Sequence, residues 1–184
     1  MKDFIIIGNM NAIAYKEIFP LIKENKIWLG VNSNKTMEFR IPAGYEKWKR
    51  IENGQKIGKV PGVSWYTNIS NETRNTPLDL YKRYSDEYHK YDNYDAIEVS
   101  KTCYIPMDYD GIMGVPISFL SKYCPTQFEI IGNFNRYKEP DEANGLLCGT
   151  PTEYIDKNGE AKIWTGPTVN KKTCYSRLLI RRRR

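Results

Sequence analysis

The sequence of 184 residues shows no complete catalytic constellation of acid–base or nucleophilic side chains. His89 is the single histidine, and because it lies in a charged stretch where we expect solvent exposure, a nucleophile–histidine pair is not predicted. The cysteines are Cys103, Cys124, Cys148 and Cys174, and no two are close enough in sequence to form a zinc ligand pair. We interpret them as reduced thiols, mostly in the core, and predict no metal site.

Acidic side chains gather in two segments of turn-like sequence. Asp92, Asp95, Asp108 and Asp110 lie in segments that also contain Asn93 and Gly111. A carboxylate metal cluster is one interpretation, and solvated turns, which these neighbours favour, are the other. The sequence contains neither Gly-x-Gly-x-x-Gly nor a Walker loop, so it predicts no phosphate cradle.

Two amides occupy the best position for a ligand. Asn9 and Asn11 follow residues 4–7 (FIII), an apolar run typical of a strand covered on both faces of a parallel α/β sheet. Ligands bind where such strands end. The two amides could orient a polar ligand, or they could satisfy the loop backbone through turn hydrogen bonds. A chain that opens on such a strand also suggests the later part of a larger fold.

The segments around this loop predict a strand, a helix and a second strand. Residues 14–25 have apolar positions at helical spacing, and residues 27–31 (IWLGV) predict a buried strand. Such a βαβ unit has parallel strands joined by a right-handed crossover. Residues 60–69 predict a further strand, with Trp65 in the core and Tyr66 on the other face.

Positive charge is concentrated in residues 35–59 and in the last four residues, which are all arginine. Residues 1–70 contain 11 Lys/Arg against 6 Asp/Glu, and the whole chain has a net charge of +6. Residues 37–42 predict an edge strand, and Asn53-Gly54 predicts a hairpin turn. The charge suggests a polyanion partner such as nucleic acid, although a solvated basic face is its commoner explanation.

A polar stretch, residues 71–76, is the predicted boundary between regions 1–70 and 71–184. Thr76 and Pro77 have the features of a helix start. Four tyrosines follow at spacings of three and four, on one face of that predicted helix: Tyr81, Tyr84, Tyr88 and Tyr91. We interpret them as a packing face, with base stacking as the alternative.

The remainder predicts a mixed α+β region. Residues 96–99 and 128–132 predict strands, Pro116 opens a short helix, and Asn158-Gly159 turns a hairpin. No apolar run reaches the roughly 18 residues that a membrane helix needs, and the first twenty residues do not form a signal peptide. We therefore expect a cytoplasmic chain that does not contact a membrane.

Six segments resemble the EcoRI-type family of adenine-specific DNA methyltransferases, and the resemblance covers essentially the whole chain. They are residues 4–13 (FIIIGNMNAI), 15–22 (YKEIFPLI), 26–30 (KIWLG), 91–97 (YDNYDAI), 109–116 (YDGIMGVP) and 175–180 (YSRLLI).

The resemblance implies a fold class and an activity. The fold is α/β: residues 4–7, 27–31 and 63–67 resemble the fifth, sixth and last strands of a Rossmann-like methyltransferase sheet, and a mixed target-recognition region follows. The activity implied is methyl transfer from S-adenosylmethionine to N6 of adenine in double-stranded DNA, in a restriction–modification system. Such enzymes act on a base swung out of the helix, because N6 is paired inside the duplex.

The chain departs from the family at the catalytic site. The tetrapeptide Asn-Pro-Pro-Phe and the glycine-rich cofactor loop do not occur in it. We therefore expect a C-terminal portion that is catalytically incomplete alone and is completed by an N-terminal half or a partner chain. The alternatives are a non-catalytic DNA-binding module derived from the family and a relic without a specific ligand. The unpaired edge of the first strand predicts self-association or dependence on a partner.

The resemblance also suggests site residues, none of them catalytic. Asn9, Asn11, Trp65 and Tyr66 are expected to flank the pocket for the displaced base. Arg136 and Lys138 could reach base edges. The candidate phosphate contacts are Lys47, Lys49, Arg50, Lys56 and Lys59.

Overall fold

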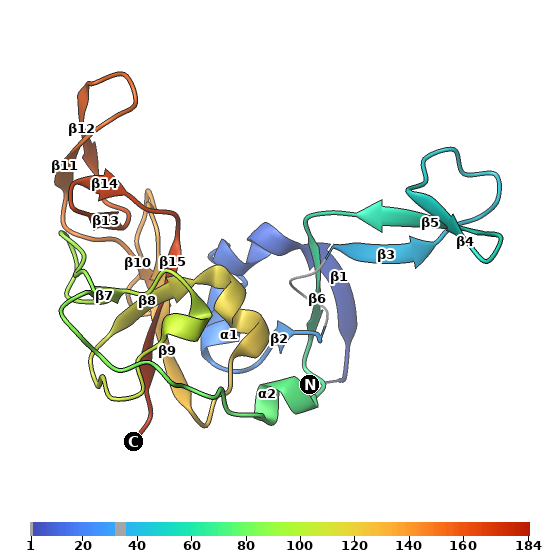
Figure 1. Cartoon of the computed structure of the whole chain (residues 1–184), viewed down its shortest axis with the longest axis horizontal. Helices are drawn as coiled ribbons and strands as arrows, with labels where there is room; N and C mark the ends of the chain where they lie inside the picture. Colours follow the sequence, from blue (N-terminus) through green and yellow to red (C-terminus); the bar gives the residue numbers. More distant parts are fainter. Residues whose placement is uncertain (1, 32–35) are drawn as a thin grey trace.

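The structure is a computed structural model that describes residues 2–31 and 36–184, and Lys35, in the predicted basic segment, lies outside them. Figure 1 shows a small sheet in the middle of the molecule, a thin β arm projecting on one side and a larger sheet on the other. Short helical segments lie between the two sheets.

The small sheet brings together the first and last strands of the predicted 1–70 region. It consists of β1 (Ile5–Asn9), β6 (Val63–Thr67) and β2 (Trp28–Leu29), in the order β1-β6-β2. Because β6 is antiparallel to both neighbours, β1 and β2 run in the same direction, as the βαβ prediction requires, but they are not adjacent. Between them lie the 3-10 helix η1 (Met10–Ala14) and the helix α1 (Phe19–Lys23), which is shorter than predicted.

The outer strand β1 is largely uncovered. Ile5, Ile6 and Ile7 are 60%, 56% and 47% exposed, so the prediction that both faces of this strand are covered is wrong for this chain. Its one paired edge faces β6, and no other strand of the described residues pairs with it. Alternate residues of a strand point to opposite faces, so β1 presents apolar side chains on both.

The expected orientation of the aromatic pair on β6 is also wrong. Tyr66 is the buried one, at 6% exposure, while Trp65 is partly exposed on the other face beside Gly30. The reason is a space above Gly8, since a Cβ there would lie 3.0 Å from the Tyr66 ring. The hydroxyl of Tyr66 donates to the carbonyl of Asn9 at 2.9 Å.

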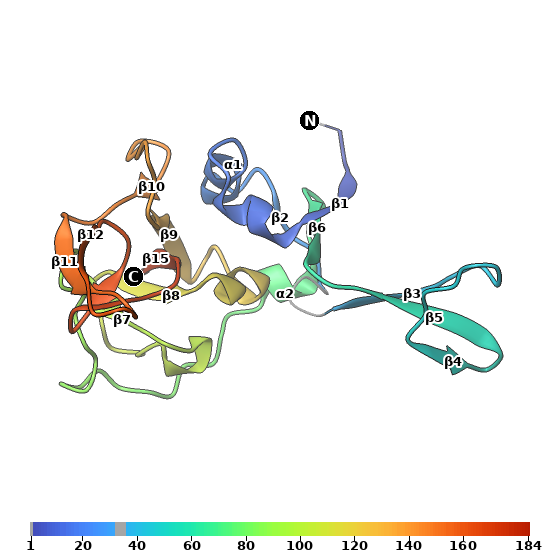
Figure 2. The ribbon, with the colours of Figure 1, turned by 90° about the horizontal axis from the view of Figure 1, so that it is seen from above.

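The arm is a separate antiparallel sheet that links β2 to β6. It comprises β3 (Met37–Arg40), β4 (Arg50–Glu52) and β5 (Gln55–Val60), in the order β3-β5-β4. Figure 2 shows it extending away from both sheets. The predicted hairpin turn is confirmed, because Asn53 and Gly54 adopt φ of 49° and 75° between β4 and β5.

The helix predicted after Thr76 is wrong, and with it the single face of four tyrosines. Helix α2 (Glu72–Asn75) forms earlier, at the predicted boundary, with Asn71 as its cap. Residues 76–96 form no helix and are held by tertiary bonds instead. Met107 N donates to the Lys82 carbonyl at 2.9 Å, and Tyr84 N donates to Asp108 Oδ1 at 2.7 Å. Propensity is a weak prior that such contacts override.

The larger sheet has the order β10-β9-β15-β8-β7. Its strands are β7 (Ile97–Glu98), β8 (Met113–Pro116), β9 (Phe128–Phe134), β10 (Leu146–Leu147) and β15 (Arg177–Arg182). Four of them are parallel to one another, and β15 runs antiparallel between β8 and β9. The 3-10 helices η2 (Thr102–Tyr104) and η3 (Ile117–Lys122) follow β7 and β8.

One hydrophobic core joins the two sheets. Phe19 and Ile13 from the N-terminal segments are fully or almost fully buried in the same cluster as Phe119, Leu178 and Ile180. None of the helices in the part of the chain that the structure describes has both the length and the apolar character needed to cross a membrane.

Two further hairpins lie beyond the larger sheet. β11 (Thr152–Ile155) pairs with β12 (Ala161–Trp164), and β13 (Thr168–Val169) pairs with β14 (Lys172–Thr173). Gly159, at φ 82°, turns the first hairpin as predicted. Of the four free cysteines, Cys124 alone is buried, so the prediction of mostly core thiols is wrong.

The terminal arginines are part of the fold. Arg181 pairs with Glu129 at 3.0 Å, and Arg184 pairs with Asp110 at 2.9 Å. Arg183 donates to the carbonyls of Pro125 and Phe128. The C-terminal charge is therefore largely engaged and is a weaker candidate for a polyanion surface than the arm.

Two isoleucine substitutions test the position of the core. Ile180→Ala removes a side chain with no exposure, so we expect the free energy of unfolding to fall by about 2–5 kcal/mol. Ile155→Ala, at a strand position that is 60% exposed, is expected to change it by about 0.5 kcal/mol or less. Urea unfolding followed by circular dichroism measures both. Equal losses in the two variants would contradict the assignment of β15 to the core.

Candidate functional site

A cavity of about 590 Å³ lies between the loop after β1 and the larger sheet. We call it the interlobe cavity. Its lining on one side comes from η1 and Tyr15, and on the other from Ile117, Ser118, Asn135 and Ser176, at the ends of β8, β9 and β15. The hydroxyl of Tyr137 donates to the Ala14 carbonyl at 3.3 Å and ties the two sides together.

Carboxamides face this cavity from both sides. The backbone of Asn11 donates to Asn9 Oδ1 at 2.8 Å, and within the described residues no hydrogen bond engages the Asn11 side chain. Asn135 uses its Oδ1 to accept from Arg136 N at 2.8 Å, which leaves its amide nitrogen available as a donor. Ser176 Oγ donates to Asn133 Oδ1 at 2.7 Å. The site can therefore offer both donors and acceptors to a planar polar ligand.

The four predicted pocket residues have different positions. Asn11 lines the interlobe cavity, whereas the side chain of Asn9 caps η1 through its turn hydrogen bond. Tyr66 stabilises the loop after β1 through its hydrogen bond to the Asn9 carbonyl. Burial raises the pKa of Tyr66 to about 12. Trp65 lies on the opposite face of β6. Their functional roles stay predictions.

The larger sheet contributes residues to the cavity that were not predicted from the sequence. Asn135 directly follows β9, and Asn11 lies just beyond the end of β1, so the same pattern of an amide after a mostly apolar strand identifies Asn135. Tyr137 and Ser176 carry no comparable signal, because only the tertiary fold brings them to the cavity.

The candidate phosphate contacts on the arm divide into engaged and free cations. Lys49 and Arg50 bind Glu38 at 2.6 and 2.7 Å. The hydrogen bonds from Lys49 and then Arg50 lower the pKa of Glu38 to about 2. Lys56 donates to the Ala43 carbonyl at 2.6 Å.

Lys47 and Lys59, by contrast, make no ion pair with any described residue, and both are exposed. Arg40, on β3 of the same arm, shares these properties. Tyr45 and Trp48, in the loop between β3 and β4, are 54% and 48% exposed. The arm therefore combines free cations with exposed aromatic rings.

The two candidate base readers follow β9. The guanidinium carbon of Arg136 lies 5.1 Å from the centre of the Trp164 ring, a cation–π contact that orients it. Lys138 is exposed. Neither lines the interlobe cavity, and their contact with bases stays a prediction.

The acidic turns have structural partners. Asp92 accepts hydrogen bonds from the backbone of Asn170 and Lys171, Asp108 accepts one from Tyr84 N, and Asp110 pairs with Arg184. These carboxylates stabilise turns and connections, as the second of the two interpretations expects.

The mixed α/β architecture, with polar side chains at the ends of strands around a cavity, is compatible with a methyltransferase-like fold. The family model described as "Adenine-specific methyltransferase EcoRI" matches residues 1–183, and the chain therefore belongs to this family. No solved structure matches the chain.

Three curated relatives agree with this family. The chain is 49% identical over 138 residues to the Type II methyltransferase M.EcoRI of Escherichia coli, covering 71% of this chain and 42% of the relative. It is 40% identical over 139 residues to the Type II methyltransferases M.MgeORF184P of Mycoplasma genitalium and M.MpnI of Mycoplasma pneumoniae, covering 71% of this chain and 44% of each. The chain thus spans less than half the length of these relatives.

The buried hydroxyl of Tyr66 gives a test by pH. Tyr66→Phe removes the hydrogen bond to Asn9, and we expect a loss of about 1 kcal/mol in unfolding free energy at pH 8. Between pH 10 and about 12 the unfolded wild type loses the Tyr66 proton while the folded state keeps it, so wild-type stability falls with pH.

The variant lacks this contribution, so the unfolding free energy of the wild type minus that of the variant should fall as the pH rises from 10 toward 12. A rise in pKa from 10 to about 12 corresponds to about 3 kcal/mol, so this difference should change sign within the interval. Urea titrations at pH 8, 10 and 11 measure it. A difference that grows over this interval would contradict the burial of the hydroxyl.

Proposed function

We propose that this chain is the C-terminal, DNA-recognising portion of an S-adenosylmethionine-dependent DNA adenine-N6 methyltransferase of restriction–modification type. In this proposal residues 1–70 supply the closing strands of the methyltransferase sheet and residues 71–184 form the target-recognition region. The family match supports the class of enzyme. The edge of β1, the interlobe cavity and the arm support the proposed division of the chain and its binding of DNA.

The observation that carries the proposal is the free apolar edge of β1. The three strands that resemble the fifth, sixth and last of the family sheet form one sheet here, with β1 at its outer edge. Three consecutive isoleucines there are about half exposed or more. An uncovered apolar edge strand invites pairing with another strand. A sheet continued by an N-terminal half, or by a partner chain that carries it, would cover this edge.

The residues present do not form a cofactor site of their own. Gly8, the glycine at the end of β1, is closed by the Tyr66 ring and offers no open cradle. The glycine-rich loop and Asn-Pro-Pro-Phe are not in the sequence. S-adenosylmethionine would therefore be held mainly by the completing half, and we derive no methyl-transfer step through this chain alone.

The interlobe cavity is the proposed place for the displaced adenine. A carboxamide can form two hydrogen bonds to adenine, through N6 and N7, and Asn11 and Asn135 present such groups from opposite sides. A volume of about 590 Å³ accommodates a nucleobase with its sugar. In the complete enzyme Asn11, at the end of the fifth strand, would lie beside the catalytic tetrapeptide.

The arm is the proposed phosphate-binding element. Its free cations, Lys47 and Lys59, can neutralise phosphates without first breaking an ion pair, whereas Lys49 and Arg50 must leave Glu38. We therefore rank Lys47 and Lys59 above Lys49, Arg50 and Lys56 as DNA contacts.

The alternative is a non-catalytic DNA-binding module derived from the family. Such a module would use the same cavity and arm to bind DNA. It differs from the first proposal in that supplying the missing half would restore no methyl transfer. The recognition portion of a methyltransferase and the non-catalytic module both require DNA binding.

Salt dependence of duplex binding tests the arm. Each phosphate contact contributes about −0.9 to the slope of log K against log salt concentration. Lys47→Ala and Lys59→Ala are each expected to reduce the magnitude of that slope by about 1. Fluorescence anisotropy with a labelled mixed-sequence duplex, titrated at several salt concentrations, measures it.

Lys157→Ala is the matched control, since it removes the same charge from an exposed turn between β11 and β12. Its slope should equal that of the wild type. Equal slopes for all four proteins would remove the arm from the DNA surface, and a wild type without salt-dependent binding would overturn the proposed function.

A further inference from the structure

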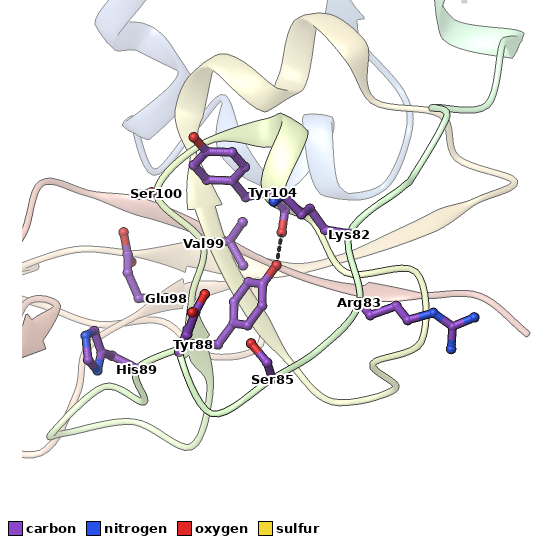
Figure 3. A pocket seen from close by; sticks show the side chains of 10 residues that line it. Lys82, Arg83, Ser85, Tyr88, His89, Glu98, Val99, Ser100 and Tyr104 are labelled. Carbon is purple, nitrogen blue, oxygen red and sulfur yellow. Dashed lines mark hydrogen bonds between the residues drawn. The ribbon is translucent and has the colours of Figure 1, made fainter.

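A second cavity opens at the edge of the larger sheet, beside β7. It has a volume of about 560 Å³, and we call it the β7 groove. Figure 3 shows Tyr88 at its centre, with His89 and Glu98 on one side and Ser85 and Arg83 on the other. Its lining includes the polar side chains of Lys82, Arg83, Ser85 and His89.

The groove lies on the same edge of the sheet as the interlobe cavity. The parallel strands β7, β8 and β9 end at this edge with Glu98, Pro116 and Phe134. Arg177, the first residue of β15, is opposite Pro116 and Phe134 in register and pairs with Glu98 at 2.7 Å. One arginine thus connects all three strand ends. Ligands of α/β sheets bind outside such carboxyl ends.

The chain that carries the groove residues is held rigidly although it has almost no regular secondary structure. Hydrogen bonds join Lys82 to Met107 and Tyr84 to Asp108. In addition, Tyr88 Oη donates to the Tyr104 carbonyl at 2.7 Å, and Glu98 N donates to the His89 carbonyl at 2.7 Å. The Tyr84 ring stacks on Tyr109 with centroids 4.7 Å apart. Because the backbone is already ordered before a ligand binds, the side chains that project from it can bind with a smaller loss of conformational entropy.

Lys82 and Arg83 offer hydrogen-bond donors to a partner in the groove, beside the carboxylate of Glu87, which also lines it. Glu98 is neutralised by Arg177 and also accepts a hydrogen bond from the Tyr91 hydroxyl. Burial and the Glu98 charge hold the pKa of Tyr91 far above its usual range, so this hydroxyl remains a donor. Lys82 and Arg83 are exposed, and the contact of Arg83 with Asp108 is loose, at 3.9 Å.

We propose that the β7 groove reads base edges of the DNA target, with Arg83 and His89 as specificity-determining residues assisted by Ser85 and Lys82. The inference rests on the proposed function, because it assumes that the strand ends face DNA. Arginine and lysine donate to O6 and N7 of guanine, and serine hydroxyls can donate to or accept from any base. The groove therefore fits a guanine-containing step beside the displaced adenine.

The test separates base reading from phosphate binding. Duplexes that bind the wild-type chain are selected from a randomised library, and affinities are then measured for a selected and an unrelated duplex. Arg83→Ala and His89→Ala are expected to lose about 5- to 150-fold in affinity for the selected duplex and to change base preference at one or two positions. Affinity for the unrelated duplex should stay within about twofold.

Two controls keep the outcomes distinct. Lys157→Ala should behave as wild type, and Lys59→Ala should weaken both duplexes alike. Equal losses on both duplexes for Arg83→Ala, with a smaller salt slope, would mean that the groove binds phosphate and would overturn base reading. Unchanged binding by both groove variants while Lys59→Ala weakens it would overturn the inference alone. A wild type that selects no duplex would overturn the proposed function as well.

Discussion

The pairing of β1 with β6 is the constraint on which the rest of the structure depends. It joins residues 54 to 62 positions apart, from Asn9 opposite Val63 to Ile5 opposite Thr67. Side chains at the end of β6 reinforce it, since Thr67 Oγ1 donates to the Phe4 carbonyl at 2.6 Å and Asn68 Oδ1 accepts from Phe4 N at 2.9 Å. Closing such a long loop is entropically costly, so the intervening segments are ordered together with this pair.

Both proposed ligand-binding elements depend on this pairing. The loop with Asn11 begins where β1 ends and is held by Tyr66 from β6 and by a bond from Met10 N to the Gly62 carbonyl at 2.8 Å. The last strand of the arm, β5, leads along the chain directly into β6. The cavity and the basic arm are therefore positioned by the same strand, β6. Its neighbour β1 has an apolar outer edge that pairs with no strand in the part of the chain that the structure describes.

The sequence predicts local features well where a single rule decides them. The turns at Asn53-Gly54 and Asn158-Gly159 follow from residues that tolerate positive φ. The strand near residue 5 follows from a continuous apolar run, and the strand near residue 128 follows from a mostly apolar segment. It fails where tertiary contacts decide. The tyrosines after Thr76 have helical spacing, yet bonds to Met107 and Asp108 hold that segment extended. Tyr66 is buried instead of Trp65 because Gly8, across the strand pair, leaves space for its ring.

Of the candidate site, the sequence finds the half that follows β1 and misses the half contributed by β8, β9 and β15. Asn11 stands in a recognisable position after an apolar strand, whereas the approach of Ser176 and Tyr137 to it depends on packing between the two sheets. The split of the arm cations into free and paired ones likewise depends on cross-strand neighbours such as Glu38.

The central claim is that this chain is the recognition portion of a methyltransferase whose catalytic residues lie elsewhere. It is tested most directly by methyl transfer from labelled S-adenosylmethionine to mixed-sequence duplex DNA. The assay uses this chain alone and together with the part of M.EcoRI that lies N-terminal to the matched segment. We predict activity only in the mixture. Methyl transfer by this chain alone, or an inactive mixture in which the two polypeptides form a stable complex, would contradict the claim.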